Sequence, residues 1–308
     1  MNRLLFSSVA YRPLRARMLA VGGLEPGEVE TSCFPDGERY QRILSDVVDR
    51  DVVLLGGTIS ESDTLEIFDL ASGLVEEGAR TLTLLMPYFG HATMERAVKP
   101  GEVVTAKTRA RLISAIPLAP GGNRLFLVDV HTEGLPYYFE GPLRPHHVYA
   151  KPLVLSVVRR LASGRETVLA CTDAGRAKWV ESLANDLGMH ASFVFKRRED
   201  DGSTHVTAMS AHVRDRHVVL YDDMIRTGGS LIGAAEAYRA AGAASLSAVA
   251  THGLLPEGAL EKLQRTGLFD AIVVTDSHPR ALELAEKGLQ VESLAPLLVD
   301  VARSRHPA

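Results

Sequence analysis

Cysteine is scarce in this sequence, with Cys33 and Cys171 the two among 308 residues. Small secreted scaffolds rely on several disulfides because their cores are too small, whereas a chain of this length buries enough apolar surface without them. The spacing of the two cysteines also matches no metal-binding motif. We therefore exclude a disulfide scaffold and expect a reducing, cytoplasmic compartment.

Long apolar runs are absent as well. No stretch approaches the roughly 20 apolar residues that a membrane-spanning helix needs. The N-terminal stretch MNRLLFSSVAYRPLRARML also has too short an apolar run for a signal peptide. We therefore expect no membrane partner.

An excess of charge of one sign is missing too. The sequence holds 34 Lys and Arg residues against 38 Asp and Glu residues, which gives a formal net charge of -4. Proteins that coat nucleic acid are strongly basic, so we expect no nucleic-acid partner. An anionic ligand would have to be bound by local groups.

What the sequence does contain is a series of short, apolar, β-branched runs that end at polar or glycine-rich turns. They include residues 51–58, 81–90, 124–132, 166–175, 217–223, 245–253 and 270–277. Segments with helical spacing, such as 65–79 and 177–188, lie between them. This alternation predicts an α/β fold with βαβ units and a mainly parallel sheet. Continuous apolar strands indicate that helices cover both faces of the sheet.

Two sets of these units flank the stretch PLRPHHVYAKPL, residues 142–153, which we interpret as a linker. The two sets are alike in the order of their elements rather than in their residues. We therefore predict two tandem domains with a duplicated fold, an N-terminal domain over residues 1–147 and a C-terminal domain over residues 148–308.

Polar residues follow several of the predicted strands. In open α/β sheets, ligands bind at the carboxyl ends of the strands, so these residues should share one edge of a sheet. They are Tyr88 to Gly90, Asp129, His131, Asp173, Asp222, Asp223, Thr251 and His252. Acids and histidines in this position predict a polar, metal-assisted site.

The stretch VVLYDDMIRTGGSL, residues 218–231, combines two acids with a glycine-rich turn. Its TGGS segment follows a predicted strand and precedes a helical segment, which places free backbone N–H groups at a helix N-terminus, where they can bind a phosphate. Asp222 and Asp223 beside it suit ribose hydroxyls or a magnesium-bound polyphosphate. No Gly-Lys-Ser/Thr follows, so this is not a Walker A loop. A helix cap with a glycine turn is the alternative interpretation.

This stretch resembles the phosphoribosyl-pyrophosphate loop of type I phosphoribosyltransferases and ribose-phosphate diphosphokinases. Further segments occur in the order that the second family has, namely CFPDGERYQRI (33–43), MPYFGHATMERAVKPGEVVTAK (86–107), VDVHTEGLPYYF (128–139), YAKPL (149–153), TDAG (172–175), FKRRED (195–200), ATHG (250–253) and VVTDS (273–277). The chain therefore resembles a divergent member of the ribose-phosphate diphosphokinase (phosphoribosyl pyrophosphate synthetase) family. The resemblance implies that both domains are type I phosphoribosyltransferase-like, each with a mainly parallel sheet flanked by helices.

The resemblance implies an enzyme of nucleotide biosynthesis that uses Mg2+ to transfer diphosphate from ATP to ribose 5-phosphate or a close phosphosugar. The products would be phosphoribosyl pyrophosphate and AMP. It also implies a homo-oligomer built from dimers, up to a hexamer. Two alternatives stay open, a non-catalytic regulatory homologue of a diphosphokinase and a phosphoribosyltransferase that consumes phosphoribosyl pyrophosphate.

Site residues follow from the same resemblance. Lys196 and Arg198 would be catalytic, because positioned cations neutralise a transferring diphosphate, although a solvated charge run is the alternative. The residues implied to bind the nucleotide are Phe34, Asp36, Glu38, Arg96 and His131. Those implied to contact Mg2+ or the triphosphate are His131 and Asp173. Those implied to hold ribose 5-phosphate are Asp222, Asp223, Arg226, Thr227, Gly228, Gly229 and Ser230.

Structural alternatives exist for two of these groups. PDG in the segment from Phe34 to Glu38 is an ordinary reverse-turn sequence, and a single His131 at a strand end is often a satisfied structural histidine.

Three positions depart from the family pattern. Arg226 stands where an aspartate is usual, the Thr93–Met94 pair replaces Arg-Gln, and Arg176 replaces a glycine. All three fall on loops predicted to face substrates, while the scaffold strands are kept. We predict an active transferase, and the sequence leaves open whether these changes alter its sugar or nucleotide substrate.

Overall fold

The chain forms two compact units in a computed structural model that describes residues 3–172, 174–198, 204–209 and 213–304, with 194–198 and 204–209 described as backbone. Unit 1 comprises Met1–Tyr149, Ser277–Pro279 and Ser293–Ala308, and unit 2 comprises Ala150–Asp276 and Arg280–Glu292. The chain first passes from unit 1 to unit 2 between Tyr149 and Ala150, inside the stretch predicted as a linker. The end of the chain, from residue 293, belongs to unit 1, whereas the sequence predicts it as part of the C-terminal domain.

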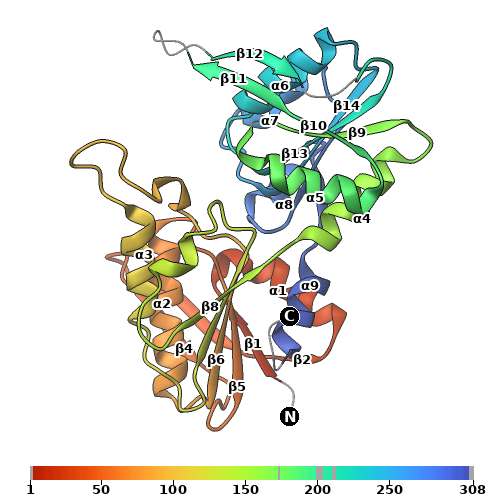
Figure 1. The fold of residues 1–308 in the computed structure, drawn as a ribbon. Coiled ribbons are helices and arrows are strands. Elements are labelled where there is room, and N and C mark those ends of the chain that lie inside the picture. Colours follow the sequence, from red (N-terminus) through yellow and green to blue (C-terminus); the bar gives the residue numbers. More distant parts are fainter. Residues whose placement is uncertain (1–2, 173, 199–203, 210–212, 305–308) are drawn as a thin grey trace. The chain divides into compact units, whose positions relative to one another are not determined.

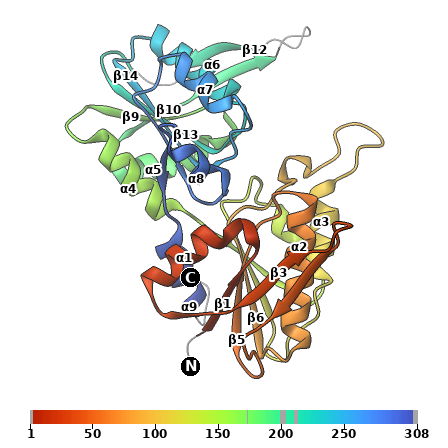
Figure 2. The same ribbon diagram turned by 180° about the vertical axis from the view of Figure 1, so that it is seen from behind.

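Unit 1 is built on a parallel sheet. In its described residues the strand order is β2 (Leu24–Pro26), β1 (Arg3–Ser7), β5 (Asp51–Leu55), β6 (Thr81–Met86), β7 (Asn123–Val128) and β8 (Arg144–Val148). Helices α2 (Glu61–Glu76) and α3 (Thr105–Ser114) cover one face, and α1 (Arg12–Val21) and α9 (Ala295–Arg303) cover the other (Figure 1). A hairpin of β3 (Val29–Cys33) and β4 (Arg39–Ile43) lies beside α2 (Figure 2).

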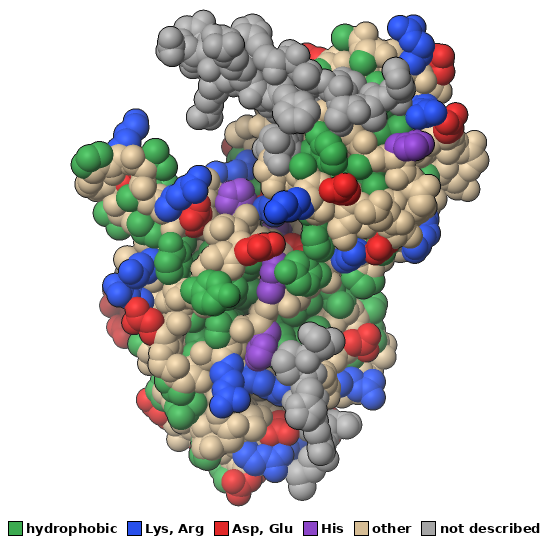
Figure 3. Space-filling view, viewed as in Figure 1, with side chains coloured by type: hydrophobic (Ala, Val, Ile, Leu, Met, Phe, Trp, Pro, Cys, Tyr) green, Lys and Arg blue, Asp and Glu red, His purple; other side chains and the backbone are tan. Residues whose placement is uncertain are grey.

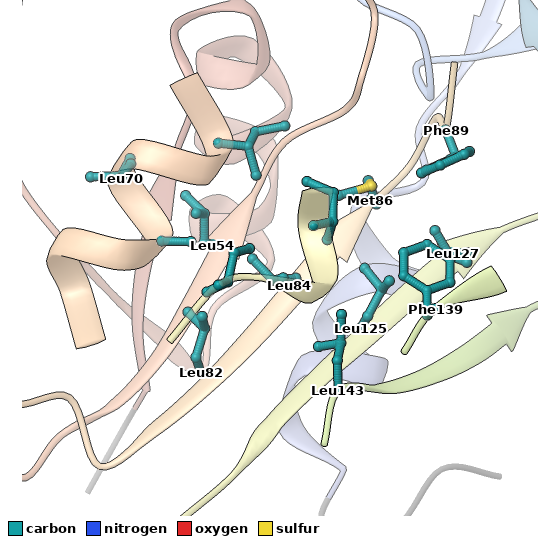
Figure 4. Close-up of a cluster of buried hydrophobic side chains, with 14 of the residues drawn as sticks. Leu54, Leu70, Leu82, Leu84, Met86, Phe89, Leu125, Leu127, Phe139 and Leu143 are labelled. Atoms are coloured by element: carbon teal, nitrogen blue, oxygen red, sulfur yellow. The ribbon is translucent and has the colours of Figure 1, made fainter. Parts of the chain in front are cut away.

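The core of unit 1 explains why its strands read as continuous apolar runs. Val53 and Leu54 point to opposite faces of the sheet, and their side chains are 0% and 1% exposed. On the face toward α2, alternate strand residues form one apolar cluster that extends from Leu70 to Phe139 (Figure 4); they are Leu54, Leu82, Leu84, Met86, Leu125 and Leu127. Helices on both faces therefore bury both sets of side chains.

Unit 2 has a parallel sheet of the same kind. Its order in the described residues is β10 (His190–Ser192), β9 (Thr167–Cys171), β13 (His217–Ile225), β14 (Ser245–Gly253), β15 (Ala271–Thr275) and β16 (Gln290–Glu292). One face packs against α4 (Lys151–Ala162) and α5 (Ala177–Leu187). The other packs against α6 (Gly229–Ala240), α7 (Ala259–Arg265) and α8 (Arg280–Ala285). An antiparallel hairpin of β11 (Val194–Arg198) and β12 (Thr204–Met209) follows β10.

The predicted α/β fold is confirmed in both units, and the stretch predicted as a linker is itself regular structure. Residues 142–153 contain strand β8 and the first turn of α4 rather than an irregular connection. β8 is an edge strand paired with β7. A proline such as Pro145 is tolerated at an edge, because its missing N–H can face away from the ladder.

The described surface is mixed in charge. On the face in Figure 3, Lys and Arg side chains are interspersed with Asp and Glu side chains. None of the helices in the described part of the chain is long and apolar enough to cross a bilayer.

Candidate functional site

The glycine-rich loop of unit 2 joins the end of β13 to the start of α6. Gly228 has a φ of 75°, in the left-handed region, and a Cβ there would lie 2.8 Å from the Leu263 side chain. Glycine is therefore the residue that this position accepts. The helix begins at Gly229, so the backbone N–H groups of its first turn are not used within the helix. Such a terminus binds a phosphate.

The remaining loop residues lie at the surface. Arg226, Thr227, Gly229 and Ser230 are exposed, while Gly228 is buried. Hydroxyl and guanidinium groups thus lie next to the helix N-terminus, and such groups can bind an anion.

The two acids at the end of β13 have different surroundings. The Asp222 carboxylate is partly buried; its oxygens accept hydrogen bonds from the Thr172 hydroxyl at 2.7 Å and from the Asp223 N–H at 2.9 Å. The Asp223 side chain is 6% exposed, and its Oδ2 lies 2.6 Å from Nη2 of Arg176. Thr172 and Arg176 both follow β9, which pairs with β13.

The ion pair of Arg176 with Asp223 is a contact that sequence reasoning did not predict. It ends the short 3-10 helix Ala174–Arg176 and precedes α5, with a side chain that is 24% exposed. The sequence identified it as a departure from the family pattern, but an arginine in a loop does not indicate its partner. The structure pairs it with one of the two predicted sugar-binding acids.

The predicted catalytic cations belong to the β11–β12 hairpin of unit 2. Lys196 pairs with Val206 and Arg198 with Thr204 in the antiparallel register. The turn between the strands lies outside the described residues, as does Asp173, one of the two predicted metal contacts. The roles of these three residues stay predictions.

In unit 1, Phe34 follows β3 at the tip of the β3–β4 hairpin. Its ring is 51% exposed and contacts the Tyr40 ring edge-to-face, with centroids 5.9 Å apart. The turn is closed by the Phe34 N–H, which donates to the Glu38 carbonyl at 2.8 Å, and by the Asp36 carboxylate, which accepts from the Glu38 N–H at 3.1 Å. Asp36 therefore has a structural role in the turn, and the role of the exposed Phe34 ring in nucleotide binding stays a prediction.

The loops after β5 and β6 approach each other closely at the carboxyl edge of the unit 1 sheet. The Gly90 N–H donates to the Thr58 hydroxyl at 2.7 Å, and a Cβ on Gly90 would fall 2.0 Å from the Thr58 carbonyl oxygen. Asp129, after β7, has a φ of 37° and is 5% exposed. The backbone bends there, and His131 follows in a partly buried position.

Arg96 lies in the loop that leads from β6 to α3. Its side chain is 77% exposed and forms an ion pair with Glu95 at 3.2 Å. An exposed pair of this kind contributes little to stability, and the nucleotide-binding role of Arg96 stays a prediction.

The described residues hold no cluster of three or more Asp, Glu, His and Cys side chains that could enclose a metal ion. Mg2+ is usually bound through one or two carboxylates together with substrate phosphates rather than by a protein cage. The donor set of this chain therefore fits a Mg2+ ion that arrives with a nucleotide.

Comparison with known proteins covers nearly the whole chain. The family model for the N-terminal domain of ribose phosphate pyrophosphokinase matches residues 3–116, and the phosphoribosyl transferase domain model matches residues 149–275. A ribose-phosphate pyrophosphokinase of Rhodopirellula baltica is 31% identical over 306 residues, which are 98% of this chain and 95% of that protein. The chain belongs to the ribose-phosphate pyrophosphokinase family.

Other members of this family give the same result. The ribose-phosphate pyrophosphokinase of Thermotoga maritima is 30% identical over 277 residues, 88% of this chain and 85% of that protein. The crystal structure of phosphoribosylpyrophosphate synthetase from Mycobacterium smegmatis superposes with a TM-score of 0.86 at 25% identity, with 98% of both chains covered. The predicted family and fold are confirmed.

Proposed function

We propose that this protein transfers the diphosphate of ATP to ribose 5-phosphate, forming phosphoribosyl pyrophosphate and AMP, with Mg2+ as the cofactor. The observation that carries the proposal is the end of β13, where two carboxylates precede an open helix N-terminus in a chain that matches ribose-phosphate pyrophosphokinases along nearly its full length. The two free cysteines, Cys33 and Cys171, agree with the cytoplasmic compartment that we include in the proposal.

The residues of unit 2 would bind and orient the sugar. The N–H groups at the start of α6, with Thr227 and Ser230, bind the 5-phosphate. Asp222 and Asp223 accept hydrogen bonds from sugar hydroxyls, which turns the C1 hydroxyl toward the β-phosphorus of ATP for in-line attack. Lys196 and Arg198 neutralise the charge that develops on the diphosphate.

The nucleotide residues proposed in unit 1 are Phe34, Asp36, Glu38, Arg96 and His131. The Phe34 ring stacks on the adenine, and Arg96 approaches the phosphates. A bound Mg2+ ion would neutralise the triphosphate, with His131 and Asp173 as its proposed contacts.

A phosphorus NMR time course with ATP, Mg2+ and ribose 5-phosphate tests the proposal. We expect the AMP and phosphoribosyl pyrophosphate signals to rise together while ATP declines. The matched control replaces both Lys196 and Arg198 by Ala, which should leave ATP binding measurable and slow the transfer. ATP that stays unchanged with the unaltered protein would contradict the proposal.

A regulatory homologue is the second candidate, favoured by the arginine at 176 on Asp223 and by the changes at Thr93, Met94 and Arg226. Light scattering gives the oligomeric state, for which we propose a dimer-based homo-oligomer. The regulatory function would be favoured if the protein by itself shows no turnover and forms mixed oligomers that change the activity of an authentic diphosphokinase.

A further inference from the structure

The ion pair between Arg176 and Asp223 changes the charge of the phosphosugar site. The Asp223 side chain is 6% exposed, and the 2.6 Å separation of Nη2 and Oδ2 is that of a short, charge-assisted hydrogen bond. Arginine stays protonated under all ordinary conditions. The guanidinium is therefore a permanent counter-ion of this carboxylate.

The neighbouring acid, Asp222, has polar contacts of its own. Asp222 accepts hydrogen bonds from a hydroxyl and a backbone N–H, neither of which is charged. Asp222, Asp223 and Arg176 together carry one net negative charge, where the two acids alone would carry two. A sugar phosphate dianion that binds at the adjacent loop meets correspondingly less repulsion.

A divalent cation would achieve the same compensation, because it also binds to carboxylate oxygens and neutralises them. In this chain the guanidinium already lies against an oxygen of Asp223, and a second cation close to it would be repelled. The carboxylate pair therefore does not fit a divalent cation.

We propose that Arg176 replaces a divalent cation at the Asp222–Asp223 pair, so that unit 2 binds a pentose 5-phosphate without Mg2+. Arg176 is then a positioning residue, which acts on the sugar through Asp223, and Mg2+ serves the nucleotide alone. This inference rests on the proposed function, since it takes the sugar phosphate as the ligand of the loop.

Isothermal titration calorimetry of the full-length protein with ribose 5-phosphate, without nucleotide, tests the inference in EDTA and in Mg2+. We expect the same Kd in both buffers, within about twofold, for the unaltered protein. Arg176→Gly should weaken the binding of ribose 5-phosphate in EDTA by about tenfold or more, as expected for loss of one close charge. Addition of Mg2+ should restore part of the affinity of this variant. Arg176→Lys keeps the charge and should keep most of the binding in EDTA.

The Mg2+ dependence separates this role from a purely structural one, because a damaged fold would weaken binding equally in both buffers. Ribose 5-phosphate binding that needs Mg2+ in the unaltered protein would overturn the inference and leave the proposed function intact. Equal binding by the Arg176→Gly variant in both buffers would overturn it too. Should Arg176→Gly fail to fold, the unaltered protein and Arg176→Lys still decide the question.

Failure of the proposed function gives a different result. If ribose 5-phosphate binds in neither buffer, it is not the substrate, and both the proposed function and the inference about Arg176 are contradicted. Binding in EDTA without any turnover of ATP would contradict the transferase and uphold the role of Arg176.

Discussion

At the scale of single residues, Gly228 connects the fold to the candidate phosphate loop. Its φ of 75° is strained for any residue with a Cβ, and that Cβ would press on Leu263 of α7. We expect Gly228→Ala to lower the free energy of unfolding by about 1–3 kcal/mol and to weaken ribose 5-phosphate binding. Trp179 is the single tryptophan of the sequence and lies in unit 2, so its fluorescence during urea unfolding measures the first effect.

The matched control is Gly233, also in α6. No atom lies within 4 Å of a Cβ built there, and its φ is not positive. Alanine has the higher helix propensity, so Gly233→Ala should raise the free energy of unfolding by about 0.5–1 kcal/mol. Equal losses in both variants would show that the backbone argument for Gly228 is wrong.

His217 predicts a pH dependence of unit 2. Its side chain is 2% exposed, with Nδ1 at 2.6 Å from the Ser245 hydroxyl and 3.3 Å from Arg165. Burial, and then the charge of Arg165, lower the pKa of His217 below its ordinary value. The unfolded chain therefore binds the proton more readily than the folded one. The neutral His217 side chain makes its full contribution to the stability of unit 2 above the pKa that histidine has in the unfolded chain, near 6.5. This stability is lost as the pH falls through the lower pKa of His217 in the folded protein.

We expect the free energy of unfolding of unit 2 to decrease below pH 6.5, by at most about 1.4 kcal/mol per pH unit from this group. His217→Asn should flatten that slope in urea titrations followed by Trp179 fluorescence. The pKa of His146 is lowered by burial as well, but His146 lies in unit 1, so His146→Asn is the control that should leave the slope of unit 2 unchanged.

Residue-level chemistry could be predicted from the sequence only where it is local. The TGGS segment specifies a turn and a helix start within four residues, and the structure has both. The partner of Arg176 could not be predicted, because it depends on how the end of β9 aligns with the end of β13, some 50 residues later. Glu66 is a similar case; it is buried in α2 and accepts a hydrogen bond from the Val9 N–H at 2.8 Å.

At the scale of elements, the β3–β4 hairpin presents Phe34 to a ligand. The proposed function makes this ring a stacking surface for adenine, an interaction worth about 1–3 kcal/mol per base. We expect Phe34→Ala to raise the KM for ATP about tenfold, with a smaller change in kcat, in steady-state assays. Phe34→Tyr keeps the ring and should keep the KM. An unchanged KM in Phe34→Ala would assign the hairpin to another role.

Strands could be predicted where burial makes them continuously apolar. β5, β6 and β13 were predicted for this reason. β8, with the sequence RPHHV, has no continuous apolar run, because of its five residues only Val148 is buried. The predicted runs do not include β1 or β2. Strand β2 is three residues long, too short for a periodicity to show, and β1 has only three apolar residues, Leu4 to Phe6.

At the scale of the whole molecule, α9 is the element that ties the end of the chain to unit 1. Leu298 is fully buried there. Leu298→Ala should cost about 2–5 kcal/mol and speed amide exchange in β1, β5 and β6, with β13 and β14 unaffected. Leu263→Ala, at a buried position in α7, should speed amide exchange in β13 and β14 and leave β1, β5 and β6 unaffected. Exchange measured by mass spectrometry distinguishes the two patterns, and uniform acceleration in either variant would mean that the units do not unfold separately.

The return of α9 to the first unit has a consequence for synthesis on the ribosome. Domains generally fold as they emerge, the N-terminal one first. Here β6 gains one of the helices that cover it only after residue 303 has left the exit tunnel, and by then all of unit 2 has been translated. The half of the protein that is made first is the half that is finished last.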